Sequence, residues 1–166
     1  LQYSLDSACK EQNLLEMRSK LAQIVPDLID QYTSVKVGGD YLINKVRSLH
    51  SFQISLAQDA ISLLDGEKRQ NLTIVDIGDS SGTHLQYLKS LLGGINIRTL
   101  SVNLDPVAVK KIREKGFEMI ESRAELLHEH PEFNGNVNIY LSFEMIEHLF
   151  DPVSFLHAMS TKSVCD

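Results

Sequence analysis

Apolar residues recur at three- to four-residue intervals through the first third of the chain, which is the spacing of an amphipathic helix. The first stripe consists of Leu14, Met17, Leu21, Val25 and Leu28. Pro26 is expected to kink this helix or to start a new turn. A second stripe begins after two glycines, with Asp40 in a position suited to an N-cap, and continues to Leu64. The pattern therefore predicts a helical segment over residues 1–66.

Beyond residue 66 the apolar positions form short, β-branched runs separated by helical segments. Strands are predicted at residues 72–77, 97–104, 117–120 and 137–143. Helices are predicted at residues 83–92 and after Asp105 and Pro106. A fifth strand is expected to start at residues 163–165.

Strands that alternate with helices imply right-handed crossovers between parallel strands. The predicted fold is therefore α/β, with a Rossmann-like, doubly wound and mainly parallel sheet whose C-terminal strands are missing. Two domains are expected: the N-terminal helices of residues 1–66 and the incomplete sheet domain of residues 67–166.

Composition narrows the class of protein further. At 166 residues and 43% hydrophobic content, the chain is long enough to bury a sizeable core. Its 16 basic and 22 acidic residues give a net charge of -6 and are dispersed, so no nucleic-acid partner is expected. No run approaches the roughly 18 apolar residues of a membrane helix, and no signal-peptide pattern opens the sequence. The expected location is cytoplasmic, with Cys9 and Cys165 as reduced thiols.

The first predicted strand runs into a loop with the sequence Asp-Ile-Gly-Asp-Ser-Ser-Gly, residues 76–82. An open α/β sheet binds its ligand at this point, in the crevice outside the carboxyl ends of the strands. Glycines let the backbone approach a ligand closely, and the following helix N-terminus offers amide donors to a carboxylate or phosphate. Two glycines four residues apart are a weak signal by themselves, and a plain structural turn is the alternative.

Two further segments make the case for a ligand-binding loop more specific. The second predicted strand ends in Asn-Leu-Asp-Pro at residues 103–106, and the fourth runs into Glu-Met-Ile-Glu-His-Leu-Phe-Asp-Pro at residues 144–152. Together with the glycine loop they resemble the class I S-adenosylmethionine-dependent methyltransferases of type 11/12, which carry a Glu-x-x-Glu-His-Leu-x-Asp-Pro segment. The resemblance covers residues 72–160 and implies methyl transfer from S-adenosylmethionine to an unidentified small-molecule acceptor.

The resemblance also assigns cofactor contacts. In that family the glycine loop passes around the amino-acid end of the cofactor, and the residue closing the second strand binds the ribose. The implied cofactor-binding residues are Asp76, Gly78, Ser80, Gly82, Asn103, Asp105 and Phe143. Asp105 has a second interpretation as the N-cap of the following helix. Residues 1–66 would then cover the site.

Four positions depart from the family pattern. Ser80 occupies the slot of the central glycine, while Asn103 and Asn138 stand where acids are usual. Arg123 replaces the aspartate that recognises the adenine amino group, and arginine has no hydrogen-bond acceptor. These departures favour an alternative function, a catalytically inactive or regulatory protein that retains the methyltransferase fold.

Methyl transfer requires mainly that donor and acceptor are aligned and that water is excluded, and a base only when the acceptor loses a proton. Glu144 and His148 are the candidate catalytic residues, because they follow the carboxyl end of the fourth predicted strand. With Glu147 they could instead bind a divalent cation, or serve as caps and hydrogen-bond partners of the loop. No metal site is assigned.

The remaining polar and aromatic residues have less specific interpretations. His84 could face the cofactor carboxylate, but a solvent-exposed side chain is the default, and residues 128–130 are expected in a solvated loop. Tyr32, Tyr41 and Phe52 could line an acceptor pocket, with core packing as the default. An unfinished sheet would expose an edge strand that could pair in a homo-oligomer.

Overall fold

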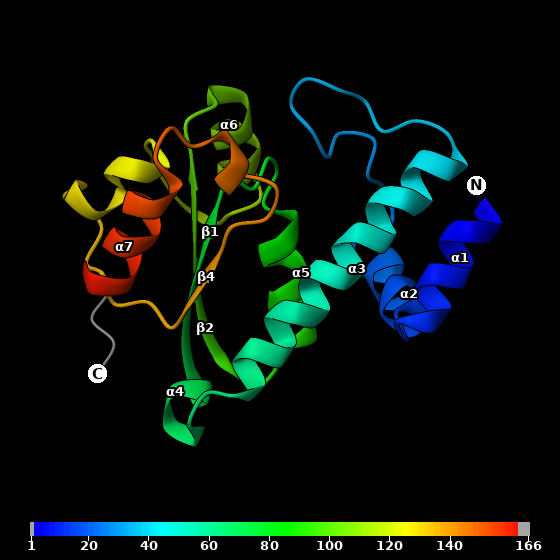
Figure 1. Ribbon diagram of the computed structural model, residues 1–166, viewed down its shortest axis with the longest axis horizontal. Coiled ribbons are helices and arrows are strands. Elements are labelled where there is room, and N and C mark those ends of the chain that lie inside the picture. The colour runs from blue at the N-terminus through cyan, green and yellow to red at the C-terminus, as the bar shows by residue number, and fades with distance from the viewer. Residues whose placement is uncertain (1, 163–166) are drawn as a thin grey trace.

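The computed structural model describes residues 2–162 and contains a four-stranded, all-parallel sheet with the strand order β3-β2-β1-β4 (Figure 1). The strands are β1 (Asn71–Ile77), β2 (Asn96–Asn103), β3 (Glu118–Glu121) and β4 (Ile139–Leu141). The helices are α1 (Gln2–Glu11), α2 (Leu15–Ile24), α3 (Asp40–Ser62), α4 (Gly66–Gln70), α5 (Thr83–Leu91), α6 (Pro106–Glu114) and α7 (Pro152–Lys162), with 3-10 helices η1 (Ala124–Glu129) and η2 (Ile146–His148). The predicted α/β class with a parallel sheet is confirmed. The strand predicted at residues 163–165 lies outside the described residues.

β1 lies in the interior of the sheet because its side chains are apolar on both faces. Leu72, Ile74 and Val75 are at most 1% exposed, and adjacent buried residues of a strand point to opposite faces. β1 pairs with β2 along its full length and with β4 from Ile74 to Asp76. The first three strands agree with the predicted positions to within one residue at each end.

β4 is shorter than the predicted strand at residues 137–143. Just before its start, the amide of Asn138 donates to the carbonyl oxygen of Thr73 at 3.0 Å, while the amide of Thr73 donates to the side-chain Oδ1 of Asn138 at 2.7 Å in place of a backbone carbonyl. Beyond its end, Glu144 has a φ of 54°, a left-handed conformation that is incompatible with an extended strand. The predicted boundaries are therefore wrong at both ends.

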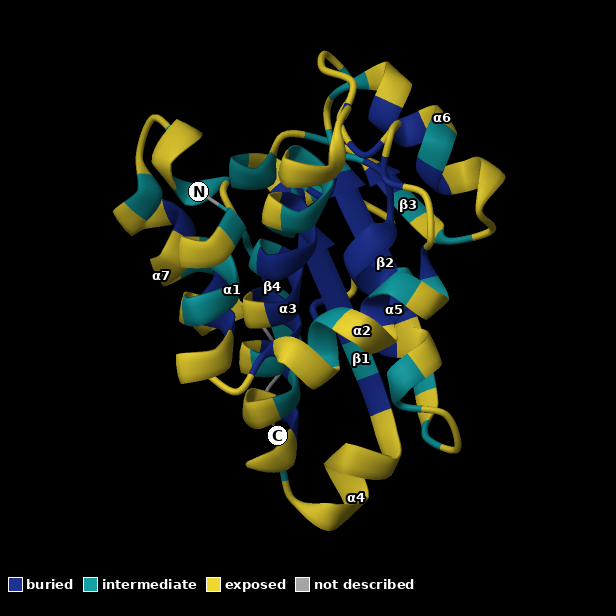
Figure 2. Ribbon diagram, turned by 90° about the vertical axis from the view of Figure 1, so that its right-hand side faces the viewer, coloured by how far each residue is buried: buried dark blue, intermediate teal, exposed yellow. Residues whose placement is uncertain are grey.

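Helices cover both faces of the sheet, and the strands between them are largely buried (Figure 2). On one face, Ile74 belongs to a core cluster with Leu21 of α2, Ile54 of α3 and Leu85 of α5. On the other face, a second cluster joins strand residues to Leu127 of η1, Phe155 of α7 and Met159 of α7. Among the helices of residues 2–162, none has the length and apolar character needed to cross a membrane.

The N-terminal third is helical, as predicted, with two differences in detail. The first apolar stripe does not stay helical as far as Leu28, because α2 ends at Ile24 and the residue before a proline, here Val25, disfavours helical backbone. Asp40 is the first residue of α3 rather than its cap, and Gly39 occupies the N-cap position without a side-chain bond. Residues 25–39 connect α2 to α3, and we call this segment the strap.

Candidate functional site

The ends of β1 and β2 open onto a cavity of about 410 Å³. Its lining includes Gly78, Asn103, Leu104, Ser122, Arg123 and His148. The structure therefore brings together residues that the resemblance assigns to the ribose, to the adenine and to catalysis. The other assigned residues, namely Asp76, Ser80, Gly82, Asp105, Phe143 and Glu144, do not line this cavity.

Asn103 connects the loops that follow β1 and β2. Its side-chain NH₂ donates to the carbonyl oxygen of Asp79 at 3.0 Å, and its Oδ1 accepts from the amide of Asp105 at 2.8 Å. An aspartate could make only the second of these bonds. Asp105 in turn accepts from the amide of Val107 at 2.8 Å and caps α6, which confirms its interpretation as an N-cap.

Two glycines of the loop are required by their backbone and surroundings. Gly78 has a φ of 92°, and a Cβ at this position would lie 2.6 Å from Cγ of Met145. Gly82 has a φ of 73° at the start of α5, and a Cβ there would lie 3.1 Å from Cδ2 of Phe117. The loop after β4 thus packs directly on the loop after β1 through Met145, which follows the left-handed residue Glu144.

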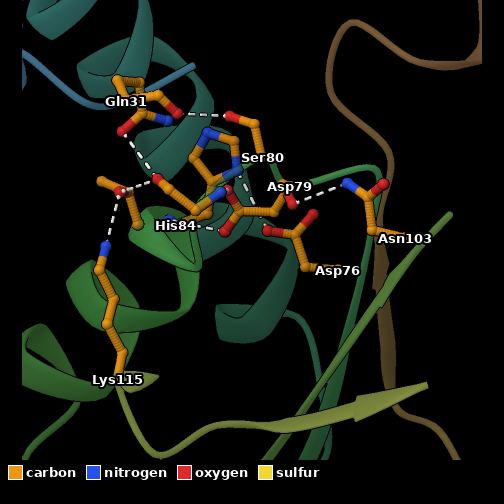
Figure 3. Close-up of polar contacts among 9 residues, drawn as sticks. Gln31, Asp76, Asp79, Ser80, His84, Asn103 and Lys115 are labelled. Carbon is orange, nitrogen blue, oxygen red and sulfur yellow. Dashed lines mark hydrogen bonds and ion pairs between the residues drawn. The ribbon is translucent and has the colours of Figure 1, made fainter. Parts of the chain in front are cut away.

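Ser80 has a contact that the family's usual glycine could not provide. Its hydroxyl donates to the carbonyl oxygen of Gln31 at 2.7 Å, and the hydroxyl of Ser81 donates to Oε1 of the same glutamine at 3.1 Å (Figure 3). Gln31 is buried, at 4% exposure. Hydrogen bonds from the two serines therefore connect the strap to the glycine loop.

Two basic side chains fasten the strap elsewhere. Nζ of Lys111 in α6 donates to the carbonyl oxygens of Asp30 and Tyr32 at 2.8 and 3.0 Å. The guanidinium of Arg47 in α3 donates to the carbonyl oxygens of Val25 and Pro26 at 2.8 and 3.0 Å. The strap is consequently held by the sheet domain and by the helical segment together.

Asp76 and Asp79, both in residues 76–82, form a buried group with His84 of α5 (Figure 3). Nδ1 of His84 lies 3.1 Å from Oδ2 of Asp76. The carboxylate of Asp79 accepts from the amides of Ser81 at 3.1 Å and His84 at 3.3 Å, and so caps the start of α5. The three residues are 1%, 3% and 7% exposed in sequence order. The prediction of a solvent-exposed His84 is therefore wrong, because the first turn of α5 faces inward toward β1.

Burial and mutual charge alter the acid-base properties of this group. Burial, together with the neighbouring Asp79 carboxylate, raises the pKa of Asp76 to about 7. Burial opposes the charged form of His84, but the carboxylates of Asp76 and Asp79 outweigh it and raise the pKa of His84 to about 9. The ring of His50 stands edge-on to His84 with centroids 5.1 Å apart, and burial lowers the pKa of His50 to about 3. His50 therefore adds no positive charge at neutral pH.

A second cavity, of about 390 Å³, lies where the strap meets the glycine loop. Tyr32, Val35 and Leu42 line it together with Ser80. Burial raises the pKa of Tyr32, and the nearby carboxylate of Glu144 adds to the shift. The strap thus places an aromatic side chain close to a candidate catalytic residue.

The exposed fractions of four side chains test the remaining sequence predictions. Tyr41 and Phe52 are 41% and 44% exposed, so core packing is wrong for both. The side chain of His128 is 11% exposed on η1, so a solvated loop is wrong there. Phe143, by contrast, is half-buried, and its ring packs edge-on to His84 at 5.2 Å between centroids.

Sequence reasoning missed the roles of Asp79, Gln31 and Lys111. For Asp79 a signal exists, since an aspartate shortly before a predicted helix is a capping residue. The two strap contacts join positions 49 and 81 residues apart, and no local pattern indicates them.

No protein-family model matches the chain, and no curated protein does.

Proposed function

We propose that this chain is a Rossmann-like, S-adenosylmethionine-dependent methyltransferase that acts on a small-molecule acceptor in the cytoplasm. The observation that carries the proposal is the 410 Å³ cavity, where Gly78, Asn103 and His148 lie together although they are far apart in sequence. Open α/β sheets bind their ligands in the crevice at this edge. Each of these residues comes from a different one of the three segments that resemble the methyltransferases.

The lining of the cavity suits an adenosyl group. Small-molecule sites are mostly apolar with a few placed polar groups, and here Leu104 and Leu149 accompany the amide of Asn103. Both ends of that amide are already bonded to the protein. One N–H and one oxygen lone pair remain for the ribose hydroxyls, because an amide carries two donors and two lone pairs.

The second cavity is the proposed acceptor site. It borders the strap and Ser80, and the charge of Glu144 acts on Tyr32 in its lining. In the proposed reaction Glu144 accepts a proton from the acceptor where one must leave, and Tyr32 helps to exclude water. His148 lines the first cavity, where the proposed cofactor would contact it.

The proposal is tested by calorimetric titration of S-adenosylmethionine and S-adenosylhomocysteine into the wild-type chain. A dissociation constant tighter than roughly 100 μM, about 5.5 kcal/mol, is expected. Leu104→Trp fills the cavity from a side chain that is 60% exposed, and it should abolish the heat. Val107→Trp is the matched control, since Val107 is 49% exposed and does not line the cavity.

A catalytically inactive or regulatory protein with the same fold is the second candidate. The observation that favours it is that Asn103 and Ser80, two of the departures from the family pattern, are engaged in contacts within the protein. Folded wild-type protein that gives no heat with millimolar cofactor would contradict the methyltransferase proposal and support this second function.

A further inference from the structure

The group formed by Asp76, Asp79 and His84 has a feature that the methyltransferase proposal does not use. One ligand atom from each side chain lies within 4.8 Å of the others, and all three residues are more than nine-tenths buried. Among residues 2–162, this is the group of side chains arranged so that it could hold a metal ion. Glu144, Glu147 and His148 do not come together in this way.

An unpartnered polar atom points to a ligand at this position. Oδ1 of Asp76 is buried without a hydrogen-bond partner. Nε2 of His84 is also unpartnered, but it lies on the far side of the ring from Nδ1, the atom that faces Asp76. Buried polar groups are nearly always bonded, so each such atom requires an explanation. The unpartnered Oδ1 of Asp76 indicates that the ion pair with His84 does not satisfy this carboxylate.

The charges of these three side chains also favour a bound cation. Among the described residues, the carboxylates of Asp76 and Asp79 face one imidazole, and neither forms an ion pair with a Lys or Arg. The charges of Lys115 and Asp79 also interact, without an ion pair. With both carboxylates ionised and His84 neutral, the two negative charges match the charge of a divalent cation. A buried charge is tolerated when it is paired or when it coordinates a metal.

We propose that Asp76, Asp79 and His84 bind one divalent transition-metal ion, with Zn²⁺ as the favoured ion. The donors are two carboxylates and one imidazole, a set that suits zinc better than the all-oxygen ligands preferred by magnesium and calcium. Each oxygen of Asp79 accepts one amide bond and keeps a second lone pair for the metal. The ion joins the end of β1, the glycine loop and the first turn of α5, and with three protein ligands its fourth position is left for a water molecule.

Metal binding to the full chain, without any cofactor, tests this proposal. The protein is stripped with a chelator, incubated for a long time with Zn²⁺ because the site is closed to solvent, and dialysed before the bound metal is measured. One equivalent of Zn²⁺ per chain is expected, with a higher melting temperature than that of the stripped protein. Folded wild-type protein that retains no Zn²⁺ would overturn the proposal and leave the group as an ion pair beside a helix cap.

Variants locate the ion. His84→Gln removes the nitrogen ligand and should weaken binding by about 100-fold or more. The double variant His148→Gln/His157→Gln replaces two exposed histidines and should keep the full equivalent. Retention of Zn²⁺ by His84→Gln would contradict the assignment.

A wild-type measurement covers the case in which His84→Gln does not fold. In histidine-ring NMR spectra of the wild-type chain, Zn²⁺ must shift the signals of His84 and leave those of His157 unchanged. The opposite pattern would place the metal elsewhere. Because cofactor is absent throughout, failure of this proposal says nothing about the proposed methyltransferase function.

Discussion

Gly78 has the most demanding surroundings of the glycines in the loop. Its φ of 92° is unfavourable for any side chain, and an added Cβ would approach Cγ of Met145 to 2.6 Å. We expect Gly78→Ala to lower the free energy of unfolding by about 1–3 kcal/mol, because backbone strain and overpacking add together. Urea denaturation measures the change.

The matched control is Gly38→Ala. Gly38 has no left-handed backbone and no atom within 4 Å of an added Cβ, so its replacement should change stability by no more than about 0.5 kcal/mol. Equal effects at both glycines would show that the contact between the loops after β1 and β4 contributes nothing.

Asn103 gives a second prediction at this scale. Asn103→Asp restores the acid that is usual at the end of the second strand in the family, but it loses the bond to the carbonyl oxygen of Asp79. We expect a loss of about 1–3 kcal/mol in unfolding free energy, since two oxygens then face each other. Asn96→Asp, whose amide bond to Asn71 is exposed, should cost less than about 0.5 kcal/mol. An Asn103→Asp variant as stable as wild type would contradict the role of the Asn103 amide in connecting the loops after β1 and β2.

Individual residues were predictable from the sequence where their partners are local. Asp105 was recognisable as a cap because it bonds an amide two residues away. The burial of His84 was not, because it depends on an aspartate in β1 and on a histidine in α3 that only the folded chain brings together.

At the scale of elements, the strap depends on a small number of side-chain contacts. Ser80→Ala removes the hydroxyl that donates to the carbonyl oxygen of Gln31. We expect the strap to open about five-fold more often, corresponding to about 1 kcal/mol for one hydrogen bond. Hydrogen exchange of residues 25–39 measures this opening.

Ser62→Ala serves as the control for the strap. Its hydroxyl also donates to a backbone carbonyl, that of Asp59, but within an exposed helix end. Exchange in the strap should not change in this variant. If Ser80→Ala also leaves the strap unchanged, Lys111 and Arg47 hold it without help from the glycine loop.

Most elements follow from hydrophobic periodicity, and the exceptions have identifiable causes. β1 is correctly predicted because a strand buried on both faces is a continuous apolar run. β4 is overestimated because the predicted strand, residues 137–143, extends two residues beyond each end of the observed strand, and the left-handed Glu144 follows directly after it. The sequence pattern predicts which residues are buried, but it does not predict the backbone conformation at which strand pairing ends.

At the scale of the whole molecule, the helical segment and the sheet share one core. Leu21 and Ile54 from the N-terminal helices belong to the same buried cluster as Ile74 and Leu141 of the sheet. The helical segment expected at residues 1–66 thus packs on the sheet through a shared core. We expect the chain to unfold in a single cooperative transition.

Ile54→Ala tests this cooperativity. Ile54 is fully buried on α3, and its truncation should cost about 2–5 kcal/mol. The helical circular dichroism signal and hydrogen exchange of β1 should report the same shifted midpoint. Leu63→Ala, at a position that is 86% exposed, should cost at most about 0.5 kcal/mol. Separate midpoints for helices and sheet in Ile54→Ala would refute a common core.

The way in which the strap is attached has a consequence for how the protein can change. Three side chains, those of Lys111, Arg47 and Ser80, donate hydrogen bonds to backbone carbonyl oxygens of the strap. Every amino acid supplies a carbonyl oxygen. Its buried side chains, those of Val25, Leu28, Gln31 and Val37, are fixed by packing or bonding, whereas Ser34 and Val35 are exposed. The exposed strap side chains beside the second cavity can therefore be exchanged by mutation without detaching the strap, which lets the shape of that cavity diverge while the fold stays the same.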